Sequence, residues 1–240
     1  LMYHQIIPED QLNNLYFTED GNLVDTVVTL EEFTKQMDYL KDHSYTVLSL
    51  KEFELFMTSG KKVPAKSVLI TIDDGFKNAF EYAYPVLKEH GYYAVHFMIT
   101  GMISDKTVPY NSSKLQYASI EELKKASDVF DYGNHTHSFH RRDQNEVAYL
   151  RSFGKDEAKK DISKANEWLG RSDAFAAPYG EYTNTTLDIL KELNVKMAFT
   201  VKHGYAEPSQ QVLEIPRISI HPAYTIEDFR YILEQQETPK

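Results

Sequence analysis

Two adjacent carboxylates stand at the end of an apolar run in the first third of the chain. The run covers Val68 to Ile72, Asp73 and Asp74 follow it, and Gly75 comes next, before a helical pattern. A short apolar run bounded by glycine is typical of a buried strand, and α/β proteins often place their chemistry at the carboxyl ends of such strands. Two like charges this close raise each other's pKa unless a cation or strong hydrogen bonds compensate, so the pair indicates a metal ion.

Three imidazoles lie within six residues after a second predicted strand, which covers about Val129 to Tyr132. They belong to His135, His137 and His140. A lone histidine is more often a surface or core residue than a ligand, but this density, together with a carboxylate pair on another strand end, favours a metal centre. The chain contains no cysteine, so carboxylates and imidazoles are the expected ligands.

Length and charge limit the possible partners. The chain has 240 residues, 42% of them hydrophobic, and no stretch reads as a linker, so we expect one domain over residues 1–240. A net charge of −10 argues against nucleic acid, because no basic stripe exists to neutralise phosphates. No apolar stretch is long enough to span a membrane, and no signal-type leader opens the chain. The sequence does not fix the oligomeric state, and a monomer is compatible with it.

Strand and helix patterns alternate along the chain. Predicted helices cover about 30–43, 49–60, 76–90, 119–126, 155–169, 183–193 and 226–233. Predicted strands cover about 45–48, 68–72, 93–100, 129–132, 174–177, 197–201 and 217–220, and Tyr3 and His4 end a first strand. Residues 101–116 show no period and are expected to form a loop on the active face. Seven or eight such units favour an α/β barrel with a parallel sheet.

These residues resemble the metal-dependent polysaccharide deacetylases of carbohydrate esterase family 4, over about residues 69–221. The first family motif, Thr-Phe-Asp-Asp-Gly, appears as Thr-Ile-Asp-Asp-Gly at residues 71–75. The resemblance implies a distorted (β/α)7-type barrel in a single domain, with a motif-bearing core at about residues 68–222. It also implies that Asp73 is the general base and that Asp74 is a metal ligand.

The second motif departs from the common family spacing. The two ligand histidines of the family are commonly four residues apart, whereas His135 and His140 are five apart. This spacing resembles the deacetylases that act on the biofilm polymer poly-β-1,6-N-acetylglucosamine, whose motif is His-Thr-His, two residues, then His. The resemblance implies that His135 and His140 bind the metal. For His137 three roles stay open: a loop histidine, a further ligand, or a residue that orients a ligand.

The third motif, Arg-x-Pro-Tyr-Gly in the family, has lost its arginine here, where Ala176 takes that position. Because the family arginine holds the general base ionised, another cation must replace it or another base must act. Arg217 is the candidate, and a surface arginine at a strand end is the alternative. The resemblance also implies that the backbone N–H of Tyr179 stabilises the oxyanion and that His221, after the last predicted strand, is the general acid.

The residues and the resemblance together predict a metal-dependent hydrolase that removes N-acetyl groups from a surface or extracellular glycan polymer, first of all poly-β-1,6-N-acetylglucosamine. Zinc is the expected ion, and cobalt, nickel or iron also suit two imidazoles and a carboxylate. Peptidoglycan or chitooligosaccharide N-deacetylation and xylan O-deacetylation are alternatives with the same chemistry. A hydrolase of a non-sugar amide stays open, as does a glycan-binding protein with an impaired site, which Ala176 and the longer histidine spacing suggest. The family's polymers imply an extracellular or cell-surface location.

Overall fold

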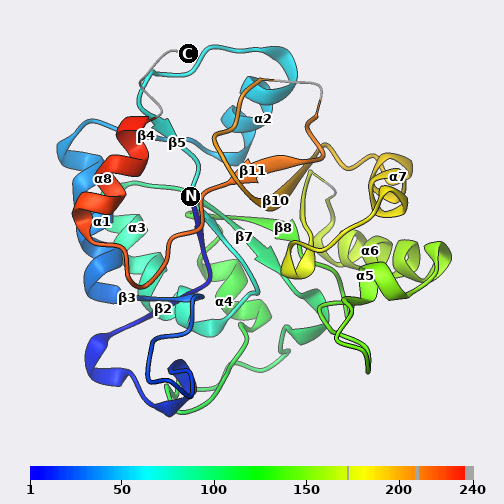
Figure 1. Ribbon diagram of the computed structural model, residues 1–240, viewed down its shortest axis with the longest axis horizontal. Helices are drawn as coiled ribbons and strands as arrows, with labels where there is room; N and C mark the ends of the chain where they lie inside the picture. Colours follow the sequence, from blue (N-terminus) through cyan, green and yellow to red (C-terminus); the bar gives the residue numbers. More distant parts are fainter. Residues whose placement is uncertain (172, 209–210, 236–240) are drawn as a thin grey trace.

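The computed structural model describes residues 1–171, 173–208 and 211–235, and a sheet of seven strands forms its centre (Figure 1). Every recorded pairing in this sheet is parallel. From edge to edge the strands are β1 (Met2–Tyr3), β6 (Thr71–Ile72), β7 (Ala94–Met98), β8 (Phe130–Asn134), β9 (Ala174–Ala176), β10 (Met197–His203) and β11 (Ile215–Arg217).

The sheet curves into a nearly closed barrel because its two edges meet at Met2. The N–H of Met2 donates to the carbonyl oxygen of Ile218 at 2.8 Å, and the N–H of Ile220 donates to the carbonyl oxygen of Met2 at 3.0 Å. A parallel bridge joins Met2 to Ser219 between these two hydrogen bonds. The prediction of an α/β barrel with a parallel sheet is therefore confirmed.

Helices surround the sheet, and capping residues set where several of them begin (Figure 1). The side chains of Thr29, Ser49 and Ser119 accept backbone N–H groups of the first helical turn, as N-cap residues do. Within the described residues, no helix is both long and apolar enough to cross a bilayer. The α-helices are α1 (Leu30–Asp42), α2 (Leu50–Ser59), α3 (Tyr84–His90), α4 (Ile120–Lys125), α5 (Tyr149–Ser152), α6 (Lys155–Leu169), α7 (Asn184–Glu192) and α8 (Ile226–Glu234).

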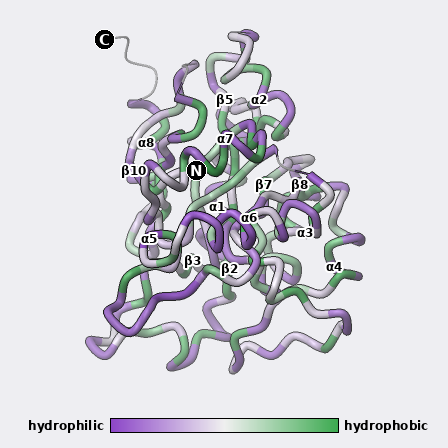
Figure 2. Tube along the Cα trace, turned by 90° about the vertical axis from the view of Figure 1, so that its right-hand side faces the viewer, coloured by the Kyte–Doolittle hydropathy of each residue, from purple (hydrophilic) through white to green (hydrophobic). Residues whose placement is uncertain are grey.

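The largest apolar core lies between the outer helices and the strands. Phe33 and Met37 of α1 are fully buried and belong to the same core as Phe229 of α8 and Ile72 of β6. Figure 2 shows hydrophobic residues along the central strands and many hydrophilic residues on the surrounding loops. The helical spacing of apolar residues in the sequence thus marks the faces that cover the barrel.

Two predicted strands differ from the structure. The apolar run 68–72 divides into β5 (Ser67–Val68), which pairs with β4 (Thr46–Val47) in a small separate sheet, and β6 in the barrel. The strand predicted over 217–220 begins earlier, as β11, and the residues after it join β1 through the bridge at Ser219 and the two backbone hydrogen bonds beside it. Residues buried on both faces show no alternation, so the sequence does not reveal where a run changes its partner.

Several short elements were not predicted. Strands β2 (Gln5–Ile7) and β3 (Val27–Thr29) form a parallel pair beside the barrel. The helix predicted over 76–90 begins as a π-helical turn, η3 (Ala79–Ala83), before α3. The 3-10 turns are η1 (Glu9–Gln11), η2 (Asn14–Tyr16), η4 (Thr100–Met102) and η5 (Pro178–Gly180).

Candidate active site at the carboxyl edge of the barrel

Asp74, His135 and His140 each bring one ligand atom to a common point. The Oδ1 atom of Asp74 lies 3.3 Å from Nε2 of His135 and 3.1 Å from Nε2 of His140. The three ligand atoms all lie within 4.8 Å of one another. Asp74 follows β6 and His135 follows β8, so the cluster stands at the carboxyl edge of the barrel, where α/β barrels place their chemistry.

The chemistry of this cluster fits a divalent metal ion. Among the described residues, no hydrogen-bond donor satisfies the buried Oδ1 of Asp74. The Nδ1 atom of His135 lies 2.8 Å from the carbonyl oxygen of Ala176, which can only accept, so in the neutral imidazole Nδ1 carries the proton and Nε2 presents its lone pair. A lone pair facing a carboxylate oxygen is unfavourable unless a cation lies between them. Two imidazoles and one carboxylate are also a common set of ligands for zinc.

Asp73 faces a different partner, the guanidinium of Arg217. Nη1 of Arg217 donates to Oδ1 of Asp73 at 2.7 Å, and Nη2 donates to Oδ2 at 2.8 Å. Nη1 also donates to the hydroxyl of Thr71 and Nε to the carbonyl oxygen of Thr200, both at 3.0 Å. The structure therefore places Arg217 where the loss of the family arginine at Ala176 calls for another cation.

The ion pair controls the protonation of Asp73. Burial raises the pKa of Asp73, but the charge and the hydrogen bonds of Arg217 outweigh burial and hold this pKa below its usual range. Asp73 is therefore ionised at neutral pH, as a general base must be. Its role as the base stays a prediction.

His4 lies closer to Asp73 than the sequence suggested. Its Nε2 atom is 3.9 Å from Oδ2 of Asp73. The cause is the parallel pairing of Tyr3 with Ile72, which places the next residues, His4 and Asp73, side by side at the ends of β1 and β6. The sequence allows Tyr3 and His4, at the end of a first strand, a place on the active face but assigns neither a catalytic role. A histidine directly after a strand was the available signal, but the partner of that strand was unknown.

His221 stands one strand further along the same edge. The bridge between Met2 and Ser219 shows that the chain leading to His221 runs beside β1, on the side away from β6. The imidazole of His221 packs edge to face on Tyr224, with ring centroids 5.2 Å apart. The structure thus brings His221 to the active edge, and the role of general acid stays a prediction.

Tyr179 lies against the metal-ligand cluster. Its ring centroid is 4.4 Å from that of His140, and its φ of +58° is rare for a residue other than glycine. The guanidinium of Arg142 lies over the Tyr179 ring at 4.3 Å and pairs with Glu181 at 2.7 Å. The next residue, Gly180, has a φ of +67°, and an added Cβ would lie 2.2 Å from the Val201 side chain, so any other residue here would be strained. This turn therefore fixes the Tyr179 backbone at the site.

The sequence left the role of His137 open, and in the structure its imidazole contacts Thr100. Its Nδ1 atom lies 2.9 Å from the hydroxyl of Thr100. Among the described residues, the cluster of possible ligands consists of Asp74, His135 and His140, and His137 is not part of it. A cleft of about 220 Å³ borders His140, and His137 and Tyr117 are among the residues that line it.

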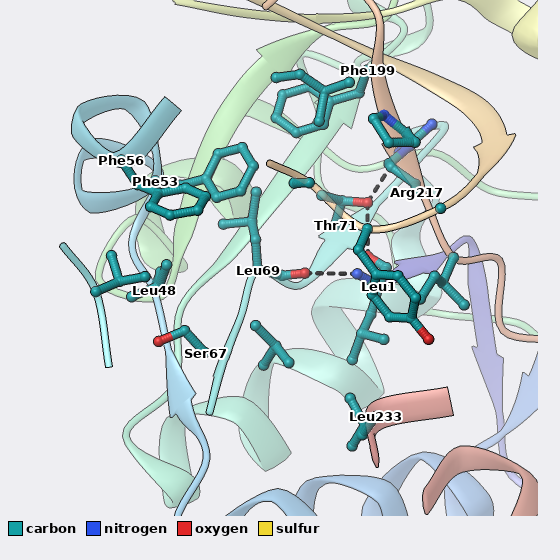
Figure 3. A pocket seen from close by; sticks show the side chains of 18 of the residues that line it. Leu1, Leu48, Phe53, Phe56, Ser67, Leu69, Thr71, Phe199, Arg217 and Leu233 are labelled. Atoms are coloured by element: carbon teal, nitrogen blue, oxygen red, sulfur yellow. Dashed lines mark hydrogen bonds between the residues drawn. The ribbon is translucent and has the colours of Figure 1, made fainter. Parts of the chain in front are cut away.

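A separate apolar cavity of about 310 Å³ reaches Arg217 from below the active edge (Figure 3). Figure 3 shows Thr71 and Arg217 hydrogen-bonded at one end of this cavity and Phe53 and Leu69 on its walls. Among the described residues that line it, neither Asp73 nor a member of the ligand cluster occurs. The cleft beside His140, in contrast, borders one of the proposed metal ligands.

The fold and the site together define a class of protein. At the carboxyl edge of an α/β barrel, Asp73 is paired with an arginine and lies beside a cluster of one carboxylate and two imidazoles. It is the arrangement of a hydrolase that uses a metal ion and a general base together.

Comparison with known proteins gives the family. Residues 60–198, more than half of the chain, match the polysaccharide deacetylase family, and the chain belongs to it. The chain is 29% identical over 229 residues to the poly-β-1,6-N-acetyl-D-glucosamine N-deacetylase of Staphylococcus aureus (strain MSSA476), covering 92% of this chain and 77% of that protein. The predicted polysaccharide deacetylase, a hydrolase acting on amide bonds, is confirmed at the level of the family.

Solved structures agree with this assignment. The Streptococcus pyogenes deacetylase PplD in complex with acetate matches with a TM-score of 0.81 and 25% identity, over 100% of this chain and 97% of that one. The structure of IcaB from Ammonifex degensii matches with a TM-score of 0.78 and 22% identity, over 99% and 95% of the two chains. The second likeness concerns the fold alone, and both support the distorted barrel that the sequence resemblance implied.

Proposed function

We propose that this protein removes N-acetyl groups from the N-acetylglucosamine units of poly-β-1,6-N-acetylglucosamine. The observation that carries the proposal is the Asp74–His135–His140 cluster directly beside the Arg217-held Asp73. The choice of polymer is supported by relatives named for this substrate that cover 92% of the chain. The five-residue histidine spacing, which resembles the same branch of the family, also supports it.

Asp74, His135 and His140 would hold one divalent ion. Zinc is the first choice for two imidazoles and one carboxylate, and cobalt, nickel and iron suit the same ligands. When bound, the ion supplies Lewis acidity, which lowers the pKa of a water molecule and polarises the acetyl carbonyl. The hydrogen bond between His135 and Ala176 orients one of the imidazoles for this task.

The protein's own groups then move the protons. Asp73, kept ionised by Arg217, takes a proton from the attacking water as a new C–O bond forms at the acetyl carbon. The backbone N–H of Tyr179 donates to the oxyanion that develops on the carbonyl oxygen. The C–N bond breaks when the sugar nitrogen receives a proton, because an amide cannot expel an unprotonated amine at neutral pH. The products are acetate and a free glucosamine amine.

Two imidazoles are candidates for the proton donor to that amine. His221 is the donor that the family resemblance implies. His4 is a second candidate, because its Nε2 lies 3.9 Å from the Asp73 carboxylate that has just taken a proton. Both stand on neighbouring strand ends, so the choice requires an experiment.

The test of the function is acetate release from poly-β-1,6-N-acetylglucosamine oligomers by metal-stripped protein reloaded with zinc or cobalt. We expect release only with metal, and a loss of about 10²- to 10⁴-fold in Asp73→Asn, the range that general-base catalysis contributes. Asp128→Asn is the matched control, since Asp128 forms an exposed ion pair with Lys88. Metal binding without acetate release, or an active Asp73→Asn variant, would contradict the proposal.

The same assay separates the other substrates. Peptidoglycan fragments, chitooligosaccharides and acetylated xylan run in parallel show whether another polymer is preferred. Glycan binding without acetate release from any of them would instead indicate a binding protein. We further propose that the protein works outside the cell or at its surface, because relatives with this name act on such a polymer.

A further inference from the structure

We propose that Asp161, on α6, is the positioning residue that holds residues 135–140, here called the histidine loop, in the form that lets His135 and His140 face Asp74. The inference rests on the metal centre proposed above. It concerns a residue outside the three ligands and outside the family motifs described above.

Asp161 binds the middle of the histidine loop with both carboxylate oxygens. Oδ1 accepts the backbone N–H of His137 and Oδ2 accepts that of Ser138, each at 2.8 Å. These two residues lie between the proposed ligands in the sequence. One carboxylate thus fixes two consecutive peptide groups, which sets the direction of the loop between its two ends.

The position of Asp161 on its helix is unusual for a charged residue. It lies on the buried face of α6 with Ala158, Ile162 and Ala165, where the helical pattern favours apolar side chains. Burial raises the pKa of Asp161, and the backbone N–H groups of His137 and Ser138 act against that shift. A buried carboxylate is costly without partners, and here the loop supplies them, so the helix and the loop depend on each other.

The histidine loop needs such support because its backbone is strained. Thr136 adopts a φ of +72°, which a β-branched residue rarely does. The side chain of Asn134 accepts the N–H of Thr136 at 2.7 Å and donates to the carbonyl oxygen of Ile162 on α6 at 2.9 Å. A second tie therefore joins the loop to the same helix.

The opposite side of the loop rests on the chain after β7. The N–H of Gly101 donates to the carbonyl oxygen of His137 at 2.8 Å. An added Cβ on Gly101 would lie only 2.4 Å from that oxygen, so the two backbones are in close contact. His137 is thus held between Gly101 and Asp161, which explains how the longer histidine spacing still directs both ends toward Asp74.

The two proposed ligands depend on this arrangement to different degrees. His135 has its own anchor, the hydrogen bond from Nδ1 to Ala176. His140 packs on the Tyr179 ring and follows the part of the loop that Asp161 fixes. We therefore expect loss of Asp161 to displace His140 more than His135, and to weaken metal binding without removing the binding site.

The experiment compares Asp161→Ala and Asp161→Asn with the same two substitutions at Asp173. Asp173 is the matched control because it pairs with Arg171 and Lys196, away from the histidine loop. Zinc affinity is measured by competition with a chromogenic chelator, and thermal unfolding of the metal-free proteins is measured beside it. Acetate release is then titrated with zinc.

We expect Asp161→Ala to lower zinc affinity by about 10- to 100-fold, the effect of losing a residue that orients metal ligands. Asp161→Asn keeps one acceptor and should lose less, and the Asp173 variants should bind zinc like the wild type. Excess zinc should restore most of kcat with KM little changed, which a merely unfolded variant would not show. If Asp161→Ala does not fold, the zinc affinity of Asp161→Asn decides.

Two outcomes would overturn the inference in distinguishable ways. Folded Asp161 variants with wild-type zinc affinity would overturn it alone and leave the proposed function intact. A wild-type protein that binds no zinc and releases no acetate with any divalent ion would overturn the metal centre, and the inference with it.

Discussion

Asp73 and Asp74 are neighbours in the sequence but have opposite surroundings. The carboxylate of Asp73 is paired with the guanidinium of Arg217, whereas Oδ1 of Asp74 faces two imidazole nitrogens. The φ of +75° at Asp74 turns the backbone between them, so that adjacent side chains reach different partners. One carboxylate can therefore serve as base while the other serves as ligand.

The pairing with Arg217 predicts a specific change in pH dependence. In Arg217→Gln the charge that favours ionised Asp73 is lost, burial dominates, and the pKa of Asp73 rises. The acid limb of kcat/KM should move upward by about 1–3 pH units, so the loss of activity is greatest at low pH and shrinks as pH rises. The measurement is the pH profile of acetate release, with Arg171→Gln, which breaks an ion pair away from the site, as control. An unmoved acid limb would show that Arg217 does not set the protonation of Asp73.

The proton donor can be identified by the leaving group. His4→Gln and His221→Gln are compared on the N-acetyl substrate and on an aryl acetate, whose leaving group departs without protonation. The variant that lacks the donor should lose about 10²- to 10⁴-fold in kcat on the amide and much less on the ester. The other variant should lose less than about tenfold on both, since it removes no proton transfer. Equal losses on the two substrates in both variants would exclude a donor role for either histidine.

Most of the candidate site could be predicted because each motif is local. Asp73 and Asp74 follow one strand and the histidines follow another, and parallel strands place such ends at one edge. The need for a cation at Asp73 followed from the family resemblance and the alanine at position 176, and the structure pairs Arg217 with Asp73. The closeness of His4 could not be predicted, because it depends on which strand pairs with β1. Asp161 was missed for a related reason, since an acidic residue on a helix gives no sign of the loop it binds.

At the scale of elements, the sequence predicts best what short-range interactions decide. Helices α1, α2 and α4 begin at the residues whose side chains cap them, and α6 ends at Gly170, which adopts a left-handed conformation. The division of the run 68–72 between β5 and β6 has no local signal, because the residues of both strands are buried and show no alternation of exposed and buried positions. The pair β2 and β3 was missed because it is decided by contacts between segments distant in the sequence.

At the scale of the whole molecule, closure of the barrel brings residues from the two edges of the sheet together at the site. Met2 links β6 to the residues after β11, and this brings Arg217 across the barrel to Asp73. The apolar cavity of about 310 Å³ in Figure 3 lies next to Arg217. The polar partners of Arg217 come from β6 and β10 and from Asp73, whereas α2 contributes apolar side chains to the wall.

We therefore expect the apolar side chains of α2 that line the cavity to support the stability of the fold without changing the pKa of Asp73. Phe53 is buried, lines the cavity and packs on Phe199, so Phe53→Ala should lower the free energy of unfolding by about 3–5 kcal/mol, as for other buried phenylalanines. Phe17→Ala is the control, because Phe17 is 38% exposed and its loss should change that free energy by no more than about 0.5 kcal/mol. Urea unfolding measures both. The folded Phe53→Ala protein should keep the acid limb of the wild-type pH profile, because each hydrogen-bond partner of Arg217 is retained. A shift of that limb would show instead that packing against the cavity, and not the ion pair alone, sets the pKa of Asp73.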